Sequence, residues 1–190
     1  MECCRMVMIE TERLKLYALT REQLETALND VNQLVAEMKI QAPPDIFSEE
    51  SRQAMMIKIS RMDHAERRLH PWYTYFLLVR ASDRAAVGVC GFKGAPSLFG
   101  SVELGYAMHE DYRNFGYMTE AVRALVDWAF EQENCSRVTA ETLPDNFASQ
   151  RVLQKAGLSL DRSADTMLYW KVDRKEVEER GNVGRRRMGT

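Results

Sequence analysis

The chain has few of the residues that build metal sites and disulfide frameworks. Its 190 residues include 3 histidines and 4 cysteines, whose spacing matches no zinc motif. We therefore assign no metal. Cys90 lies in an apolar run and is predicted to be a small core residue. So few cysteines, without a disulfide framework, are typical of a protein of the reducing cytoplasm.

The sequence also lacks long hydrophobic runs and an excess of one charge. No run approaches the length of a transmembrane helix, and residues 1–8 lack the apolar core of a signal peptide. A net charge of -2 gives no electrostatic basis for general nucleic-acid or membrane binding. With 45% hydrophobic and 28% charged residues, the composition indicates a globular chain large enough for one domain.

The most informative segment present is Arg113-Asn114-Phe115-Gly116-Tyr117-Met118. It follows an alternating, strand-like run (102–108) and precedes a helix-like run (119–133). The first N–H groups of a helix have no partner within it and carry the positive end of the helix dipole. Since glycine allows close backbone approach, the segment is a candidate phosphate site. The alternative is an ordinary strand-to-helix turn; Walker A and dinucleotide-binding motifs are excluded by the glycine pattern.

The remaining pattern predicts a single α+β domain with a mainly antiparallel sheet and helices on both faces. Residues 9–172 form this domain, residues 1–8 a flexible N-terminus and residues 173–190 a charged tail that ends in an arginine cluster. We expect the tail to be frayed and solvated rather than an RNA-binding arm. The predicted strands are 9–19, 72–81, 86–93, the strand carrying Glu103, 137–143, 158–162 and 167–172; the predicted helices begin at Thr20, Val31, Ser48, Thr119 and Asn146.

Three segments resemble one family, in that family's order. Asp145–Gly157 closely resembles the Asn-x-x-Ser…Lys-x-Gly segment of the GNAT N-acetyltransferases, and Glu10–Leu16 resembles the first strand of their RimJ/RimL-like subgroup. Arg113–Met118 is then similar to the pyrophosphate loop of that family. Two positions depart from its pattern. Met118 stands where the family usually has Gly or Ala, so its bulk is expected to crowd the pyrophosphate, and Asn114 stands where the subgroup often has Gly.

The resemblance implies a GNAT fold and acetyl-CoA as co-substrate, and it places the cofactor. It implies that residues 113–118 bind the pyrophosphate, that the Met108 backbone binds the pantetheine amides, and that Asn146 lines the cofactor channel. On physical grounds Arg113 can pair directly with a phosphate. The residues of this set are Met108, Arg113, Asn114, Phe115, Gly116, Tyr117, Met118 and Asn146.

Acyl transfer to an amine needs a base that keeps the amine neutral and an acid for the departing thiolate. Glu103 is our first candidate base, because it alternates with Val102 and Leu104 and so faces away from the core. Glu141, on the next predicted strand, is the rival.

Ser149 is the candidate acid, since the matching serine has this proposed role in RimL-like enzymes. Asn146 shares its helix face one turn earlier and is also a good N-cap. Tyr112 and Tyr117 are the alternative acids, although Tyr117 is better explained as a core aromatic residue.

We predict a cytoplasmic N-acetyltransferase that moves an acetyl group directly from acetyl-CoA to a primary amine, with a protein N-terminus as one candidate acceptor. The alternatives are a small-molecule or antibiotic acetyltransferase, a catalytically silent CoA-binding regulator and, least favoured, an RNA-binding module. We expect an amine-bearing partner and neither membrane nor nucleic acid; a homodimer is left open. Nothing in residues 22–71, where the family shapes its acceptor groove, identifies the acceptor.

Overall fold

The computed structural model describes residues 7–179, which fold around one eight-stranded sheet with the order β1-β2-β3-β4-β5-β6-β8-β7. Every neighbouring pair of strands is antiparallel except β5 and β6, which are parallel. The elements are β1 (Met8–Glu10), β2 (Leu14–Ala18), α1 (Arg21–Asn29), α2 (Val31–Met38), α3 (Glu49–His64), η1 (Arg67–Trp72), β3 (Tyr75–Arg80), β4 (Ala86–Phe92), β5 (Ser101–Met108), η2 (Glu110–Tyr112), α4 (Tyr117–Glu131), β6 (Arg137–Thr142), α5 (Phe147–Ala156), β7 (Ser159–Ala164) and β8 (Met167–Asp173).

The predicted fold class is confirmed, with one correction at the start of the chain. The single strand predicted over residues 9–19 is wrong: the chain turns at residues 11–13 and forms the β1–β2 hairpin. Thr11 closes this turn, because its backbone N–H and its hydroxyl both donate to the carbonyl of Leu14. Alternation alone does not reveal such a turn, since the buried residues of β2 keep the period of an uninterrupted strand.

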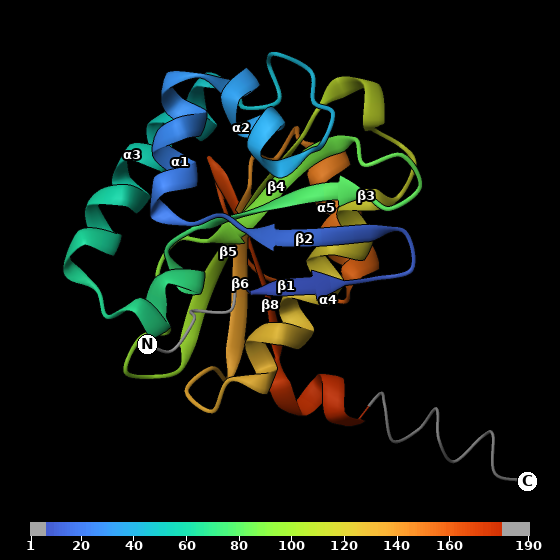
Figure 1. Cartoon of the computed structure of the whole chain (residues 1–190). Helices are drawn as coiled ribbons and strands as arrows, with labels where there is room; N and C mark the ends of the chain where they lie inside the picture. Colours follow the sequence, from blue (N-terminus) through green and yellow to red (C-terminus); the bar gives the residue numbers. More distant parts are fainter. Residues whose placement is uncertain (1–6, 180–190) are drawn as a thin grey trace, which may run out of the picture.

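α1 and α3 begin at the capping residues Thr20 and Ser48, and α2 begins at Val31, as predicted. Thr20 and Gln23 form a full capping box at the start of α1, and Ser48 accepts from the N–H of Ser51 at the start of α3. On α3, Ile57 is 56% exposed, whereas Lys58, the next residue, is buried. α1, α2 and α3 cover one face of β2, β3 and β4 (Figure 1).

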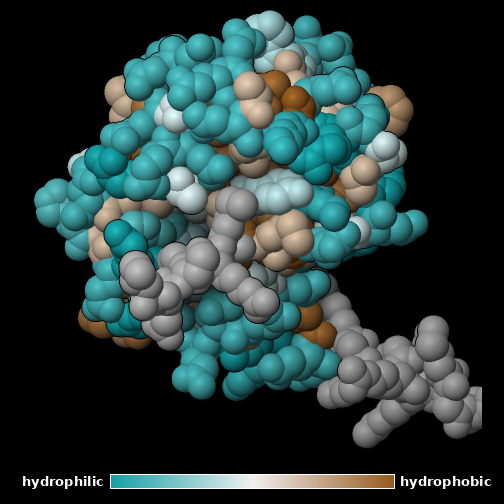
Figure 2. Space-filling model, viewed as in Figure 1, coloured by the Kyte–Doolittle hydropathy of each residue, from teal (hydrophilic) through white to brown (hydrophobic). Residues whose placement is uncertain are grey.

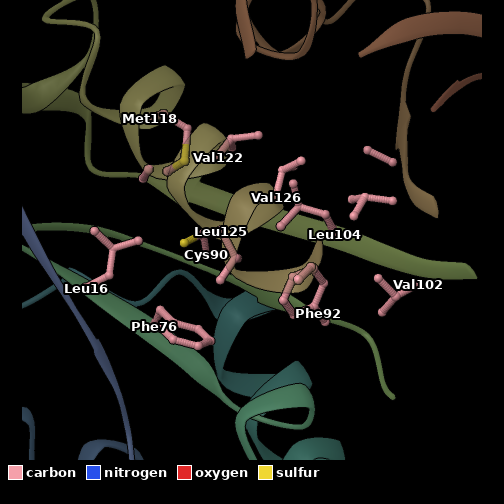
Figure 3. Packing of buried hydrophobic residues seen from close by; sticks show 14 of the residues in the cluster. Leu16, Phe76, Cys90, Phe92, Val102, Leu104, Met118, Val122, Leu125 and Val126 are labelled. Carbon is pink, nitrogen blue, oxygen red and sulfur yellow. The ribbon is translucent and has the colours of Figure 1, made fainter. Parts of the chain in front are cut away.

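The main core lies on the other face of the sheet, beneath α4 and α5. One side of β5 contributes Val102 and Leu104, and α4 contributes Met118, Val122 and neighbouring apolar residues (Figure 3). The alternation proposed for the strand carrying Glu103 is therefore present, because both of its neighbours are at most 4% exposed. This packing fixes which face of β5 each side chain occupies.

The surface seen in Figure 2 is mostly hydrophilic, with apolar side chains scattered over it. Within residues 7–179, no helix has the length and apolar character needed to cross a membrane. After β8, residues 174–179 are helical, and Arg174 donates to the carbonyl of Gln132 at 2.5 Å. The arginine cluster at residues 185–187 lies outside the described residues.

Candidate active site

The sheet opens into a wedge between β5 and β6. These parallel strands pair only from Ser101 to Glu103 and from Arg137 to Thr139. Beyond that point β5 continues along β4, and β6 continues along β8. We call the region where the two strands diverge, beyond Glu103 and Thr139, the wedge.

The backbone of β5 on the wedge side is free to bind an extended ligand. The odd-numbered residues of β5 bond to β4, as shown by the hydrogen bond of 2.8 Å from the N–H of Lys93 to the carbonyl of Glu103. In an antiparallel pair the intervening residues point their N–H and C=O groups the other way. The backbone groups of Tyr106 and Met108 therefore face the wedge, and the Met108 carbonyl receives one bond of 3.4 Å from Arg113 Nε.

The loop from Arg113 to Met118 has the backbone conformation that its glycine suggested. Gly116 has φ +81° and precedes α4 without a capping side chain, so the first N–H groups of the helix are available to an anion. Asn114 has φ +67°, a left-handed conformation in which asparagine is the best tolerated residue after glycine. This conformation explains why asparagine can stand where related loops carry glycine.

Arg13, which the sequence reasoning did not include in the site, holds this loop in place. Its Nη1 donates to the carbonyl of Phe115 at 2.9 Å, and its guanidinium lies 4.8 Å from the centre of the Tyr117 ring. Its Nε pairs with Glu120 Oε2 at 2.7 Å. Burial opposes ionisation of Glu120, but hydrogen bonds from Thr11 and Arg13 outweigh it and lower the pKa of this carboxyl. The contact joins residues more than 100 positions apart, so no local motif could indicate it.

The side chains of this loop divide between core and surface. Tyr117 and Met118 are 8% and 5% exposed and belong to the main core, whereas Phe115 is 60% exposed. The expectation that the bulk of Met118 would crowd the pyrophosphate is wrong, because this side chain packs beside Val122 and points away from the loop surface (Figure 3). Met118 can contribute its backbone N–H without obstructing the loop.

On the α5 side of the wedge, Ser149 pairs with a tyrosine that the sequence reasoning missed. Asn146 Oδ1 accepts from the N–H of Ser149 at 3.0 Å, which confirms its N-cap geometry. Tyr106 Oη lies 2.7 Å from Ser149 Oγ and donates to the Ser149 carbonyl at 3.1 Å. Burial raises the pKa of Tyr106 to about 12, which keeps the phenol protonated. The alternation of Tyr106 with Leu104 along the strand is the sequence signal that could have placed Tyr106 on this face.

The two tyrosines considered as alternative acids lie elsewhere. Tyr112 packs under the guanidinium of Arg80, 5.3 Å from its ring centre, and beside His109. Tyr117 is buried, as expected for a core aromatic residue, and its hydroxyl lies 3.5 Å from Arg80 Nη1. The hydroxyl pair of Tyr106 and Ser149 is therefore the better source of a proton for the wedge.

The two candidate bases lie on the opposite face of the sheet from Tyr106. Lys93 connects them: its Nζ forms an ion pair with Glu103 and lies 3.7 Å from Glu141 Oε2. A Cβ added at Gly105, the next residue of β5 on this face, would meet no atom within 4 Å. A pocket of about 300 Å³ opens here, lined by Glu103, Thr139, Ala140, Glu141, Asp161, Arg162, Tyr169 and Trp170.

This arrangement suits group transfer through the sheet. Carboxylates lie on one face of β5, paired hydroxyls lie on the other, and the backbone of the wedge between them can bind an extended thioester. The loop and the start of α4 provide N–H groups for a phosphate beside the same strand. Among residues 7–179, no three His, Cys, Asp or Glu side chains are grouped to hold a metal ion. The loop and the wedge-facing backbone of β5 offer N–H and C=O groups to a ligand that carries both a phosphate and an extended amide chain.

Comparison with known proteins identifies the family. The family model of the acetyltransferase (GNAT) domain matches residues 13–159. The chain is 28% identical over 167 residues to the uncharacterized N-acetyltransferase YjdG of Bacillus subtilis (strain 168), an alignment that covers 87% of this chain and 97% of that protein.

Two solved structures are similar in fold. Ribosomal-protein-S5-alanine acetyltransferase from Vibrio fischeri has a TM-score of 0.62 and 18% identity, over 90% of this chain and 98% of that one. RimL, a ribosomal L7/L12 alpha-N-protein acetyltransferase solved in complex with coenzyme A, has a TM-score of 0.61 and 16% identity, over 88% and 98%. At these identities the similarity establishes the fold alone.

Proposed function

Because the chain belongs to the GNAT acetyltransferase family and is an acetyl-CoA-dependent N-acetyltransferase, we propose that it acetylates a primary amine directly, with a protein N-terminal amine as the first candidate acceptor. The observation that carries the proposal is the wedge, with Glu103 on one face of β5 and the Tyr106–Ser149 pair on the other. The ribosomal-protein acetyltransferases of similar fold are the reason for naming an N-terminal amine as the first candidate. We expect the reaction to take place in the cytoplasm.

In the proposed mechanism the loop and the start of α4 bind the pyrophosphate, and Arg113 pairs with a phosphate oxygen. The wedge-facing backbone of Tyr106 and Met108 holds the pantetheine as an added strand would be held. This placement brings the thioester between the two faces of β5. Within residues 7–179 the two cysteines, Cys90 and Cys135, are both buried, so neither is placed to carry the acetyl group.

The proton steps use groups on opposite faces. Glu103, directly or through a water molecule, accepts the proton of the acceptor ammonium, and the neutral amine attacks the thioester carbonyl. The C–S bond then breaks, Ser149, hydrogen-bonded to Tyr106, gives a proton to the departing thiolate, and the nitrogen loses its second proton as the amide forms. Tyr106 can replenish that proton, because its hydroxyl lies 2.7 Å from Ser149 Oγ and is protonated at neutral pH.

The test is a screen of N-terminal peptides and small amines for CoA release, with each product verified by mass spectrometry. Glu103→Gln and Glu141→Gln form a matched pair, since both carboxylates face the same pocket and contact Lys93. We expect the first to lose about a hundredfold in turnover and the second far less. If Glu141→Gln showed the larger loss of turnover, the base would be Glu141 on β6. If only small amines were acetylated, the acceptor would be a small molecule and not a protein N-terminus. If no amine were acetylated, the proposed function would be contradicted.

A further inference from the structure

Lys93 lies directly across from Glu103 on the neighbouring strand. It follows the last register pair of β4 and β5, Phe92 with Leu104, and its backbone N–H continues the ladder to the Glu103 carbonyl at 2.8 Å. Arg61 donates to the Lys93 carbonyl and so fixes the backbone from the other side. Residues directly opposite in an antiparallel pair share a face. The Lys93 side chain is therefore confined near the candidate base.

The amine of Lys93 occupies the place that the mechanism requires for an acceptor. Its Nζ forms an ion pair with the buried oxygen Glu103 Oε1 and lies 3.7 Å from Glu141 Oε2. The Lys93 side chain is 59% exposed, so it can move. A primary ammonium with two carboxylates beside it is chemically the same arrangement as a bound amine substrate before its deprotonation.

We propose that Lys93 is an intramolecular acetyl acceptor, so that the enzyme acetylates its own Lys93 Nζ when acetyl-CoA is bound and no external amine is present. The inference rests on the proposed role of Glu103 as the base. Glu103 removes one proton from the ammonium, and the lone pair of Nζ attacks the thioester carbonyl carbon. The C–S bond breaks, CoA leaves as the free thiol, and Lys93 becomes an uncharged acetamide, with one proton released in the net reaction.

Tethering favours this reaction over acetylation of the other lysines. An amine held beside the reacting centre has a high effective concentration, which a lysine elsewhere on the surface lacks. Lys15 provides the matched comparison, because its Nζ also pairs with a glutamate, 3.4 Å from Glu10 Oε1, but on β2, away from the wedge. Proximity to a carboxylate alone would thus acetylate both lysines, whereas the active site would acetylate only Lys93.

The experiment incubates the purified full-length protein with acetyl-CoA alone and follows the acetylation of each lysine by peptide mass spectrometry. We expect Lys93 to be modified at least about tenfold faster than Lys15, at a rate that does not change when the protein is diluted. Glu103→Gln should slow the modification of Lys93 and leave that of Lys15 unchanged. Urea-denatured protein should lose the difference between the two lysines, and Lys93→Arg should lose the single fast site.

Equal rates at Lys93 and Lys15, or an unmodified Lys93, would overturn the inference. So would a Lys93 rate that increases with protein concentration, because one molecule would then be acetylating another. The wild-type amine and peptide screen separates this failure from that of the proposed function. Acetylation of an external amine beside an unmodified Lys93 would reject only the intramolecular acceptor, whereas no acetyl transfer to any amine would reject both.

Discussion

Lys58 offers a quantitative test of the structure, because it places an amine in the interior of the domain. Only 7% of this residue is exposed, and its Nζ donates to the carbonyls of Thr74 at 3.1 Å and Phe92 at 2.5 Å. Burial, aided by the charge of Arg61, lowers the pKa of Lys58 from 10.5 to about 7. We predict that this lysine makes folding stability increase with pH above neutrality.

The sign follows from proton counting. Between about pH 7 and pH 10.5 the unfolded chain keeps a proton on Lys58 that the folded chain has largely lost, so the free energy of unfolding increases with pH. Integrated from about pH 7 to about pH 9, with the folded amine half protonated at the start, the gain is roughly 2 kcal/mol. Lys58→Met keeps the aliphatic length and removes this contribution.

The assay is urea unfolding of the wild type and Lys58→Met at both pH values. The variant controls for every other titrating group, because both proteins share those groups. The quantity of interest is therefore the change with pH in the difference between their free energies of unfolding. With a slope of about 2 kcal/mol per molar urea, the midpoint of the wild type should rise relative to the variant by about 1 M. A difference that is constant with pH would refute the reasoning. It would mean that the two carbonyls and the Tyr75 ring, 4.6 Å away, keep the folded amine charged.

Four further predictions concern the site and the start of α4. Glu103→Gln should leave the affinity for acetyl-CoA nearly unchanged by calorimetry while turnover falls, because the carboxylate lines the pocket of about 300 Å³ and does not face the loop. Ser149→Ala and Tyr106→Phe should each lower kcat by about tenfold or more with little change in the acetyl-CoA affinity; unchanged kcat in both would exclude the hydroxyl pair as the acid. Gly116→Val should weaken acetyl-CoA binding, because a β-branched residue is strained at φ +81°. Met118→Ala should cost about 2–5 kcal/mol of stability, because it leaves a cavity in the core. A Met118→Ala protein as stable as the wild type would contradict the placement of Met118 in the core.

The sequence by itself determined the features that depend on neighbours along the chain. Strand alternation placed Glu103 opposite the core, the capping residues Thr20 and Ser48 began their helices, and Gly116 marked the turn into α4. Each of these signals is local, because a cap, a turn or a strand face involves residues only a few positions apart. The resemblance of three such segments to one family was then sufficient to predict the fold.

Only the tertiary structure decided which of these local features meet. Tyr106 reaches Ser149 across 43 positions, and Lys93 meets both candidate bases because three strands lie side by side. Met118, which local reasoning placed in the loop, belongs to the core because the axial rotation of α4 against the sheet turns it inward. Such contacts depend on strand order and helix packing, which no short segment encodes, and they set the chemistry of the wedge.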